Sequence, residues 1–276
     1  MTPLELDVLA ELGIKPLWQL RANAPAAVQA DAVLVPHQAP PAPDDALPPE
    51  RPLRPPMPAA RPQVIRPVAA AAPAAANAVA ALPPVPGLAQ MGWAELDAAV
   101  RDCRRCGLCE QRKQAVLGVG DPQADWLFVG EGPGAEEDER GEPFVGAAGR
   151  LLDSMLAAIG LQRGEQVYIA NAVKCRPPGN RTPDASEIEA CKPYLLRQIE
   201  LLQPRLIVAM GRPAAQTLLE QEVKIGSARG QVFERQGRPV IVTYHPAYLL
   251  RNPLDKARAW EDLCFARAHM AGLALD

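Results

Sequence analysis

The most informative stretches of the sequence are WLFVGEGPG at residues 126–134 and VIVTYHP at residues 240–246. In each stretch a short apolar run ends in glycine or polar residues, and such runs are typical of buried strands in a parallel sheet. Open α/β sheets bind ligands beyond the carboxyl ends of their strands. We therefore expect Glu131 and His245 to meet in one cleft, although they lie far apart in the sequence.

Strands and helices alternate through the carboxy-terminal part of the chain. Apolar runs at residues 167–170 and 206–210 predict two more strands, which end next to Asn171 and Gly211. Helices are expected around these strands, over residues 93–100, 147–159, 186–202, 213–219 and 254–271. This alternation favours a three-layer α/β/α sandwich with a central, mainly parallel sheet.

Composition divides the chain into three predicted parts. Residues 1–22 carry apolar positions at helical spacing and predict a short amphipathic helical segment. Residues 23–91 are rich in alanine and proline and lack periodic apolar positions, which predicts a disordered linker. Residues 92–276 are expected to form the compact domain. The net charge of −3 excludes little, because a local basic stripe can hide in a nearly neutral total.

Membrane and secretory signals are not visible in the sequence. No apolar run approaches the length of a membrane span, and no secretory leader is recognisable. Cysteines in a chain of this kind suggest metal or cluster ligation rather than disulfides.

The cysteines form pairs with different spacings. Cys103 and Cys106 make a C-x-x-C pair, and fifteen residues separate Cys175 from Cys191. Four thiolates can hold zinc or a [4Fe–4S] cluster, and unliganded buried thiols are the third alternative. The spacing fits zinc ribbons poorly but leaves cluster and zinc open. The remaining cysteines are expected to be ordinary packed or exposed residues: Cys109 and Cys264.

Several blocks of sequence occur in a characteristic order between Cys103 and Leu263. They are the C-x-x-C pair, GEGPG with the acidic residues that follow, PFVG, NAVKCRPP and the block around His245. Together they resemble the family four uracil-DNA glycosylases, the iron–sulfur type of bacteria and archaea. The resemblance implies the uracil-DNA glycosylase fold and a monofunctional enzyme that flips out uracil, excises it by hydrolysis and initiates base-excision repair. It also implies a [4Fe–4S] cluster with four ligands: Cys103, Cys106, Cys175 and Cys191.

The resemblance implies three roles around the uracil ring. Asn171 would read the base, because one amide can accept from N3–H and donate to O4. Phe144 would stack on the flipped ring. His245 would donate to uracil O2 as negative charge builds there. Each residue also has an ordinary alternative: a turn-capping asparagine, a core phenylalanine and a hydrogen-bonded turn histidine.

Other residues of the glycine turn complete the implied pocket. Glu131 would lie near the attacking water and the sugar, where it orients water, offsets positive charge, or does both. Gly132 would let backbone amides approach the base. Glu137 would face the C5 position and help to reject thymine. The alternative for both acids is a solvated turn residue.

The residues after His245 are expected on a loop that meets DNA. An apolar wedge, Leu249 or Leu250, would fill the gap left by the flipped base, and Arg251 would hold a phosphate. The alternative is a hydrophobic approach to the last helix. Polar residues near the third cysteine are further candidates to follow the DNA backbone, unless they are merely solvated: Lys174, Arg176, Asn180 and Arg181.

Two other functions stay open at this point. One is a related glycosylase that acts on other deaminated bases, and the other is a non-enzymatic DNA-binding module built on a cluster or on zinc. Residues 9–18 are similar to the amino terminus of the psi subunit of bacterial DNA polymerase III. That similarity implies a replication or repair protein as a partner, besides uracil-containing DNA. We expect the protein in the bacterial cytosol or nucleoid.

Overall fold

The computed structural model describes residues 82–273. The predicted amphipathic segment at residues 1–22, with its proposed partner-binding stretch 9–18, lies outside the described residues, as does most of the predicted linker. Within residues 82–273, no helix combines the length and the apolar character that crossing a bilayer requires.

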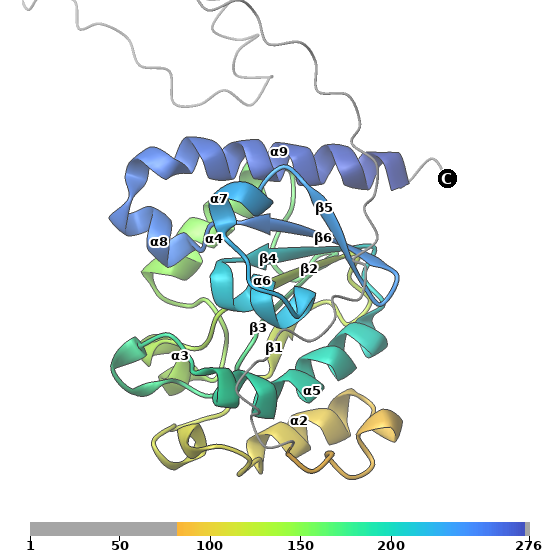
Figure 1. The fold of residues 1–276 in the computed structure, drawn as a ribbon, viewed down its shortest axis with the longest axis vertical. Helices are drawn as coiled ribbons and strands as arrows, with labels where there is room; N and C mark the ends of the chain where they lie inside the picture. Colours follow the sequence, from red (N-terminus) through yellow and green to blue (C-terminus); the bar gives the residue numbers. More distant parts are fainter. Residues whose placement is uncertain (1–81, 274–276) are drawn as a thin grey trace, which may run out of the picture. The chain divides into compact units, whose positions relative to one another are not determined.

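Residues 82–273 contain a six-stranded sheet with the order β1-β3-β2-β4-β6-β5 (Figure 1). The strands are β1 Gly118–Gly120, β2 Trp126–Gly130, β3 Val167–Asn171, β4 Leu206–Met210, β5 Val232–Arg235 and β6 Arg238–Thr243. The central strands β3, β2, β4 and β6 run parallel, while β1 and β5 pair antiparallel at the edges. The expected mainly parallel sheet is confirmed.

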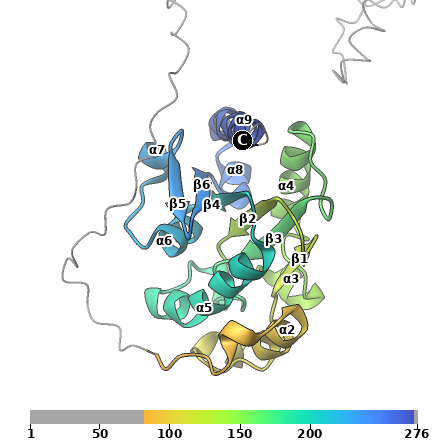
Figure 2. The ribbon, with the colours of Figure 1, turned by 90° about the vertical axis from the view of Figure 1, so that its right-hand side faces the viewer.

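Helices cover both faces of this sheet (Figure 2). The α-helices are α2 Trp93–Arg101, α3 Ala135–Arg140, α4 Ala147–Ala158, α5 Ala185–Leu202, α6 Arg212–Leu219, α7 Ile225–Ala228, α8 Pro246–Arg251 and α9 Lys256–Leu273. Short 3-10 turns lie at η1 Leu88–Gln90, η2 Gly107–Glu110, η3 Pro178–Asn180 and η4 Pro253–Asp255. Buried side chains of α5 and α6 pack on one face and those of α4 and α9 on the other. This is the predicted three-layer sandwich.

The core explains why the central strands are uninterrupted apolar runs. Every residue of β2 is buried, with Leu127 and Val129 packed toward α5 and α6, and Trp126 and Phe128 toward α4 and α9. A strand covered on both faces needs apolar side chains at every position. Each fully buried large side chain contributes about 1.5–3 kcal/mol relative to exposure.

A further hydrophobic cluster lies beyond α5, away from the sheet. Leu96 and Val100 of α2 pack there with Leu108 and Tyr194, and with the buried thiols. The layer joins the cysteines to the sandwich, because α5 contributes side chains both to this cluster and to the sheet-facing core.

The strand register aligns the ends of the parallel strands. Gly130 of β2 pairs with Asn171 of β3, and Met210 of β4 pairs with Thr243 of β6. In the sheet, β3 lies on one side of β2 and β4 on the other, so the chain changes direction across the sheet at β2. Such a change of direction leaves a crevice at the carboxyl end of the strand. The residues that follow these strands therefore reach the same edge of the sheet.

Candidate active site

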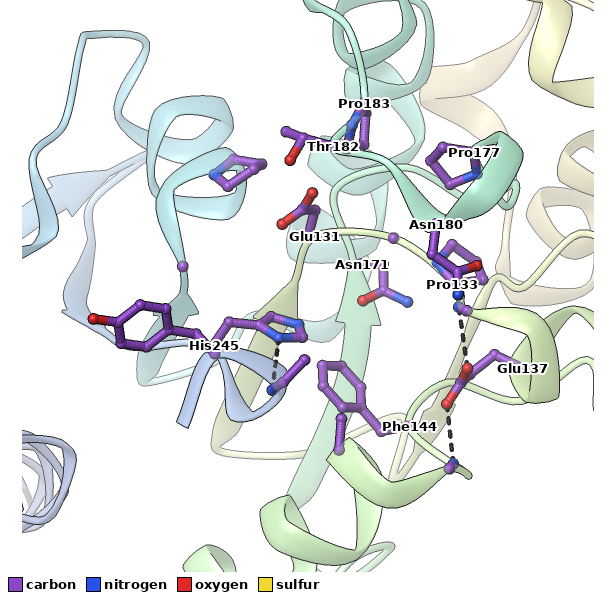
Figure 3. A pocket seen from close by; sticks show the side chains of 18 of the residues that line it. Glu131, Pro133, Glu137, Phe144, Asn171, Pro177, Asn180, Thr182, Pro183 and His245 are labelled. Atoms are coloured by element: carbon purple, nitrogen blue, oxygen red, sulfur yellow. Dashed lines mark hydrogen bonds between the residues drawn. The ribbon is translucent and has the colours of Figure 1, made fainter. Parts of the chain in front are cut away.

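A cavity of about 780 Å³ opens at this carboxyl edge of the sheet. Glu131, Phe144, Asn171 and His245 line it, and Figure 3 shows their side chains directed toward a common space. They come from the turn after β2, the loop before α4, the end of β3 and the turn after β6. The structure thus brings together the four side chains that the sequence placed in one pocket.

Asn171 is the last residue of β3 and is 2% exposed. Its Oδ1 is buried and has no hydrogen-bond partner among residues 82–273. The glycine beside it is sterically required, because a Cβ on Gly130 would lie 2.5 Å from that oxygen and 2.5 Å from Cζ of Phe144. A buried acceptor without a partner costs about 1–3 kcal/mol, so a ligand that donates to Oδ1 recovers this energy.

His245 caps the amino terminus of α8. Its Nδ1 accepts a hydrogen bond from the backbone N–H of Ala247 at 3.1 Å, so the proton of the neutral ring is on Nε2. That Nε2 is buried and lacks a partner within the described part of the chain. Burial is the main cause that lowers the pKa of His245 to about 4; the nearby Arg251 adds to this shift and Glu137 opposes it. Near neutral pH the imidazole is therefore an uncharged donor.

The backbone around Phe144 holds its ring as a wall of the cavity. The ring is 5% exposed, and its centroid lies 5.4 Å from that of the His245 ring. Phe144 has φ 56°, a conformation that costs about 1–3 kcal/mol for a residue with a side chain. Arg163 stabilises it by donating to the carbonyls of Pro143 at 3.0 Å and Phe144 at 2.9 Å.

Glu131 follows β2 and is half-buried at the cavity wall. Burial raises the pKa of its carboxyl, while a hydrogen bond with Thr182 and the charges of Arg212 and Arg251 lower it. Two residues later, Gly132 has no room for a side chain, because a Cβ would lie 2.7 Å from Cγ2 of Val173.

Glu137 lies on α3 and also lines the cavity. Its carboxylate accepts from the backbone N–H groups of Gly134 at 3.0 Å, Val145 at 3.0 Å and Gly146 at 3.1 Å. The interpretation as a solvated acid is wrong, since both oxygens are engaged. The carboxylate joins the glycine turn to the loop that carries Phe144.

The structure corrects the predicted DNA wedge. Residues 246–251 form helix α8 instead of a loop, with Pro246 at its first turn. The helix turns Leu249 into the core, where it is 1% exposed, so the prediction that Leu249 contacts DNA is wrong. Leu250 is 45% exposed. Arg251 is exposed and lines the cavity.

The basic residues predicted to contact the DNA backbone lie in different environments. Lys174 is 1% exposed, so the hypothesis that it follows the DNA backbone is wrong, and burial lowers its pKa to about 8. Arg181 lines the cavity with a side chain that is 40% exposed, and it donates to Glu187 at 2.9 and 2.6 Å. Its contact with DNA stays a prediction.

Arg176 stays a prediction as a DNA contact, and the cavity is lined by another arginine besides Arg181 and Arg251. Arg176 is half-buried and donates to Asn180 at 2.7 Å. Arg212 was missed: it is exposed, begins α6 and lines the cavity. Its position directly after the strand-end residue Gly211 was the available signal.

The cysteines line another cavity, between α2, η2 and α5. All four predicted ligands line it, and so does Cys109. Arg112 donates to Sγ of Cys175 at 2.8 Å, and the backbone N–H of Lys174 donates to Sγ of Cys191 at 3.2 Å. Burial raises the pKa of Cys175 to about 11 and of Cys191 to about 12, so a bound cation would be needed to hold these thiolates.

The donor set fits a [4Fe–4S] cluster, because four thiols line one cavity and N–H groups donate to two of the sulfurs. Among residues 82–273, no group of three or more histidine, cysteine or acidic side chains has the geometry for one metal ion. N–H donors that point at sulfur are typical of cluster sites.

Comparison with known proteins gives a family. Residues 117–264 match the family model described as the uracil DNA glycosylase superfamily. The chain is 44% identical over 183 residues to the type-4 uracil-DNA glycosylase of Pyrobaculum aerophilum, which covers 63% of this chain and 92% of that relative. It is 48% identical over 169 residues to the type-4 enzyme of Archaeoglobus fulgidus (57% of this chain, 84% of the relative). It is 47% identical over 161 residues to that of Thermotoga maritima (58% and 83%). The chain therefore belongs to the uracil DNA glycosylase superfamily and, within it, to the type-4 family.

Proposed function

We propose that this protein is a monofunctional DNA glycosylase that flips uracil out of DNA and hydrolyses the bond between uracil N1 and deoxyribose C1′. This reaction initiates base-excision repair. One observation carries the proposal: Asn171 Oδ1 and His245 Nε2 are buried, lack partners within residues 82–273 and line the same cavity. One atom is an acceptor and the other a donor. They match N3–H and O2, which are neighbours on the uracil ring.

His245 stabilises the leaving group. When the bond between C1′ and N1 breaks, its electron pair stays with uracil, and negative charge develops on O2. The neutral imidazole donates a hydrogen bond from Nε2 to that oxygen and keeps its own proton. Removing one such donor from a transition state typically costs about 10²–10³ in rate. The burial of the ring makes this bond stronger than it would be in water.

Glu131 acts on the sugar side of the same bond. Its carboxylate lines the same cavity as Asn171 and His245 (Figure 3), and we place the sugar on its side of the cavity. In the ionised form it offsets positive charge on the sugar and accepts a hydrogen bond from the water that attacks C1′. Arg212 and Arg251 favour that ionised form against the effect of burial.

Phe144 and its loop select the base. The ring offers a flat apolar wall, and the contacts of Arg163 and Glu137 hold the loop in place. Because this wall is held rigidly, it cannot move aside for a larger base. Thymine carries a methyl group that uracil lacks, and we propose that this methyl group would collide with the loop.

We infer that a [4Fe–4S] cluster is held by Cys103, Cys106, Cys175 and Cys191. It would supply a covalent crosslink between the segment after α2 and the segment after β3, and we assign it no redox step. A brown protein whose broad visible absorption disappears on oxidation would support the cluster. A colourless protein that contains zinc would contradict it.

The decisive experiment measures free uracil released from defined single-stranded and duplex oligonucleotides. Asn171→Ala should lower kcat/KM by about 10²-fold or more, because the base loses its reader. Gln123→Ala is the matched control, since it removes an exposed amide in a turn before β2. Unchanged uracil release by Asn171→Ala would contradict the assigned pocket. Hypoxanthine substrates tested in parallel would reveal the related activity on other deaminated bases.

A protein partner is a separate part of the proposal. The similarity of residues 9–18 to the psi-subunit terminus supports docking to a replication or repair protein. Deleting residues 1–22 should leave uracil release from oligonucleotides unchanged while reducing repair in cells. Equal repair by the shortened protein would contradict the docking role.

A further inference from the structure

Lys174 is a charged side chain in the core, between the cavity of the cysteines and the cavity that Asn171 lines. It is 1% exposed. Its Nζ donates to the main-chain carbonyl of Asn171 at 2.8 Å and to Oε1 of Gln198. Its backbone N–H donates to Sγ of Cys191 at 3.2 Å. One residue therefore contacts both sites directly.

The ammonium of Lys174 forms no ion pair with a carboxylate among residues 82–273. Its side-chain hydrogen bonds there go to a carbonyl and a neutral amide, and the Sγ of Cys191 lies 3.2 Å from its backbone nitrogen. A buried ammonium without an opposite charge costs several kcal/mol. The thiolates of the proposed metal centre are the negative charges that would balance it.

The other contacts of Lys174 hold it in one place. Gln198 is fully buried, and its Nε2 donates to the carbonyl of Leu117 at 3.0 Å and to the hydroxyl of Tyr168 at 3.3 Å. The carbonyl of Lys174 itself accepts from the backbone N–H of Val116 at 2.8 Å. The ammonium is thus anchored from the sheet and from α5, and so is the carbonyl of Asn171 that it binds.

We propose that Lys174 is a positioning residue that couples the metal centre to the base-reading amide by holding the main chain of Asn171. The inference rests on the proposed function of that amide. The main chain of Asn171 sets where its Oδ1 enters the cavity. A misplacement of about 1 Å can cost on the order of 10²-fold in rate, so this tether matters for catalysis without touching the substrate.

The test is a double-mutant cycle with Lys174→Met, Asn171→Ala and the double variant, with Lys113→Met as an exposed control for loss of a lysine. We expect Lys174→Met to keep its iron and visible absorption and to lower kcat/KM for uracil release by about tenfold. In the Asn171→Ala background the same change should cost less than about twofold, because the two residues act as one unit. The reduction potential of the cluster should become more negative when the nearby positive charge is removed.

Three results would overturn the inference. They are kcat/KM within about twofold of wild type in Lys174→Met, additive losses in the double variant, and loss of the cluster from Lys174→Met. If Lys174→Met does not fold, the cycle is run with Lys174→Gln, which is neutral and polar, and the same results decide. Failure of the proposed function would appear as no uracil release by the wild type, whereas failure of this inference appears only in the variants.

Discussion

His245 is the residue whose burial has the clearest consequence for pH dependence. In the folded state its pKa lies at about 4, whereas the ordinary value is 6.5. Between these values the unfolded chain binds a proton that the folded protein does not, so stability is present above pH 6.5 and is lost as pH falls through the folded pKa. The loss from this group is at most about 3 kcal/mol.

We therefore expect the free energy of unfolding to fall more steeply from pH 6.5 to pH 4 in wild type than in His245→Gln. Urea unfolding followed by tryptophan fluorescence measures this directly. His269→Gln is the control, because that imidazole is only partly buried. Its replacement should change the fall in the free energy of unfolding between pH 6.5 and pH 4 less than His245→Gln does. Parallel pH profiles for wild type and His245→Gln would contradict the assigned burial effect.

Leu249 and Leu250 form a matched pair of adjacent residues with opposite environments. Leu249→Ala should destabilise the fold by about 2–4 kcal/mol, because it opens a cavity in the core. Leu250→Ala should change stability by less than about 0.5 kcal/mol. It should lower uracil release from duplex more than from single-stranded DNA, because a single strand has no base-pair gap to fill. If Leu249→Ala instead lowered uracil release from duplex DNA and Leu250→Ala destabilised the fold, the assignment of the two leucines would be contradicted.

At the scale of elements, α9 braces the turn that carries His245. Asp262 of α9 is buried and accepts from the hydroxyl of Thr243 at 2.7 Å and from Nε of Arg229 at 2.8 Å. The Arg229 guanidinium lies 5.4 Å from the ring centroid of Tyr244, the residue before His245. A helix distant from the pocket thus holds the strand end that delivers the histidine.

Asp262→Asn should destabilise the protein by about 1–3 kcal/mol and lower kcat, because a buried charged partner is lost. Glu261→Gln is the matched control: it contacts the same arginine at 3.1 Å, but its side chain is 71% exposed. Exposed pairs contribute less than about 1 kcal/mol. Thermal unfolding and uracil release are measured for both variants, and equal effects would contradict the brace.

At the scale of the whole molecule, the proposed cluster joins the α2 layer to the sandwich. The four proposed ligands come from the segment after α2, the segment after β3 and helix α5, which meet at the hydrophobic cluster of Leu96, Val100 and Tyr194. Without a metal centre, the thiols form no bond that links these segments. Cys191→Ser should therefore lose the visible absorption, lower the melting temperature and make residues 93–113 sensitive to protease. Cys264→Ser is the control, since that thiol lies on α9. A Cys191→Ser protein as stable as wild type would contradict this structural role.

Much of this fold could be predicted from local sequence. The apolar runs of β2, β3 and β4 determine strands that are buried on both faces, and the strand ends place Glu131, Asn171 and His245 at one edge. The C-x-x-C pair and the spaced cysteines predicted a common site, and they do line one cavity. These features could be predicted because backbone preferences and the spacing of apolar residues are set within a few neighbouring residues.

The edge strands were missed because their local signals are weak. β1 is three residues long and includes Gly120, where a Cβ would lie 2.2 Å from the carbonyl of Val167. β5 is a partly exposed strand that pairs with β6 through a tight turn at Gln236 and Gly237, both with positive φ. Pairing with a neighbour, rather than propensity, stabilises both strands.

Local sequence was enough to predict the four central strands, most of the long helices, the shared edge of the sheet and the residue types at that edge. Long-range packing was needed to show that Lys174 is buried, that Glu137 binds backbone amides, and that Leu249 and Leu250 face opposite ways. The physical reason is that burial depends on which distant elements pack together. The same lysine or leucine is a surface contact or a core residue according to neighbours that local sequence does not specify.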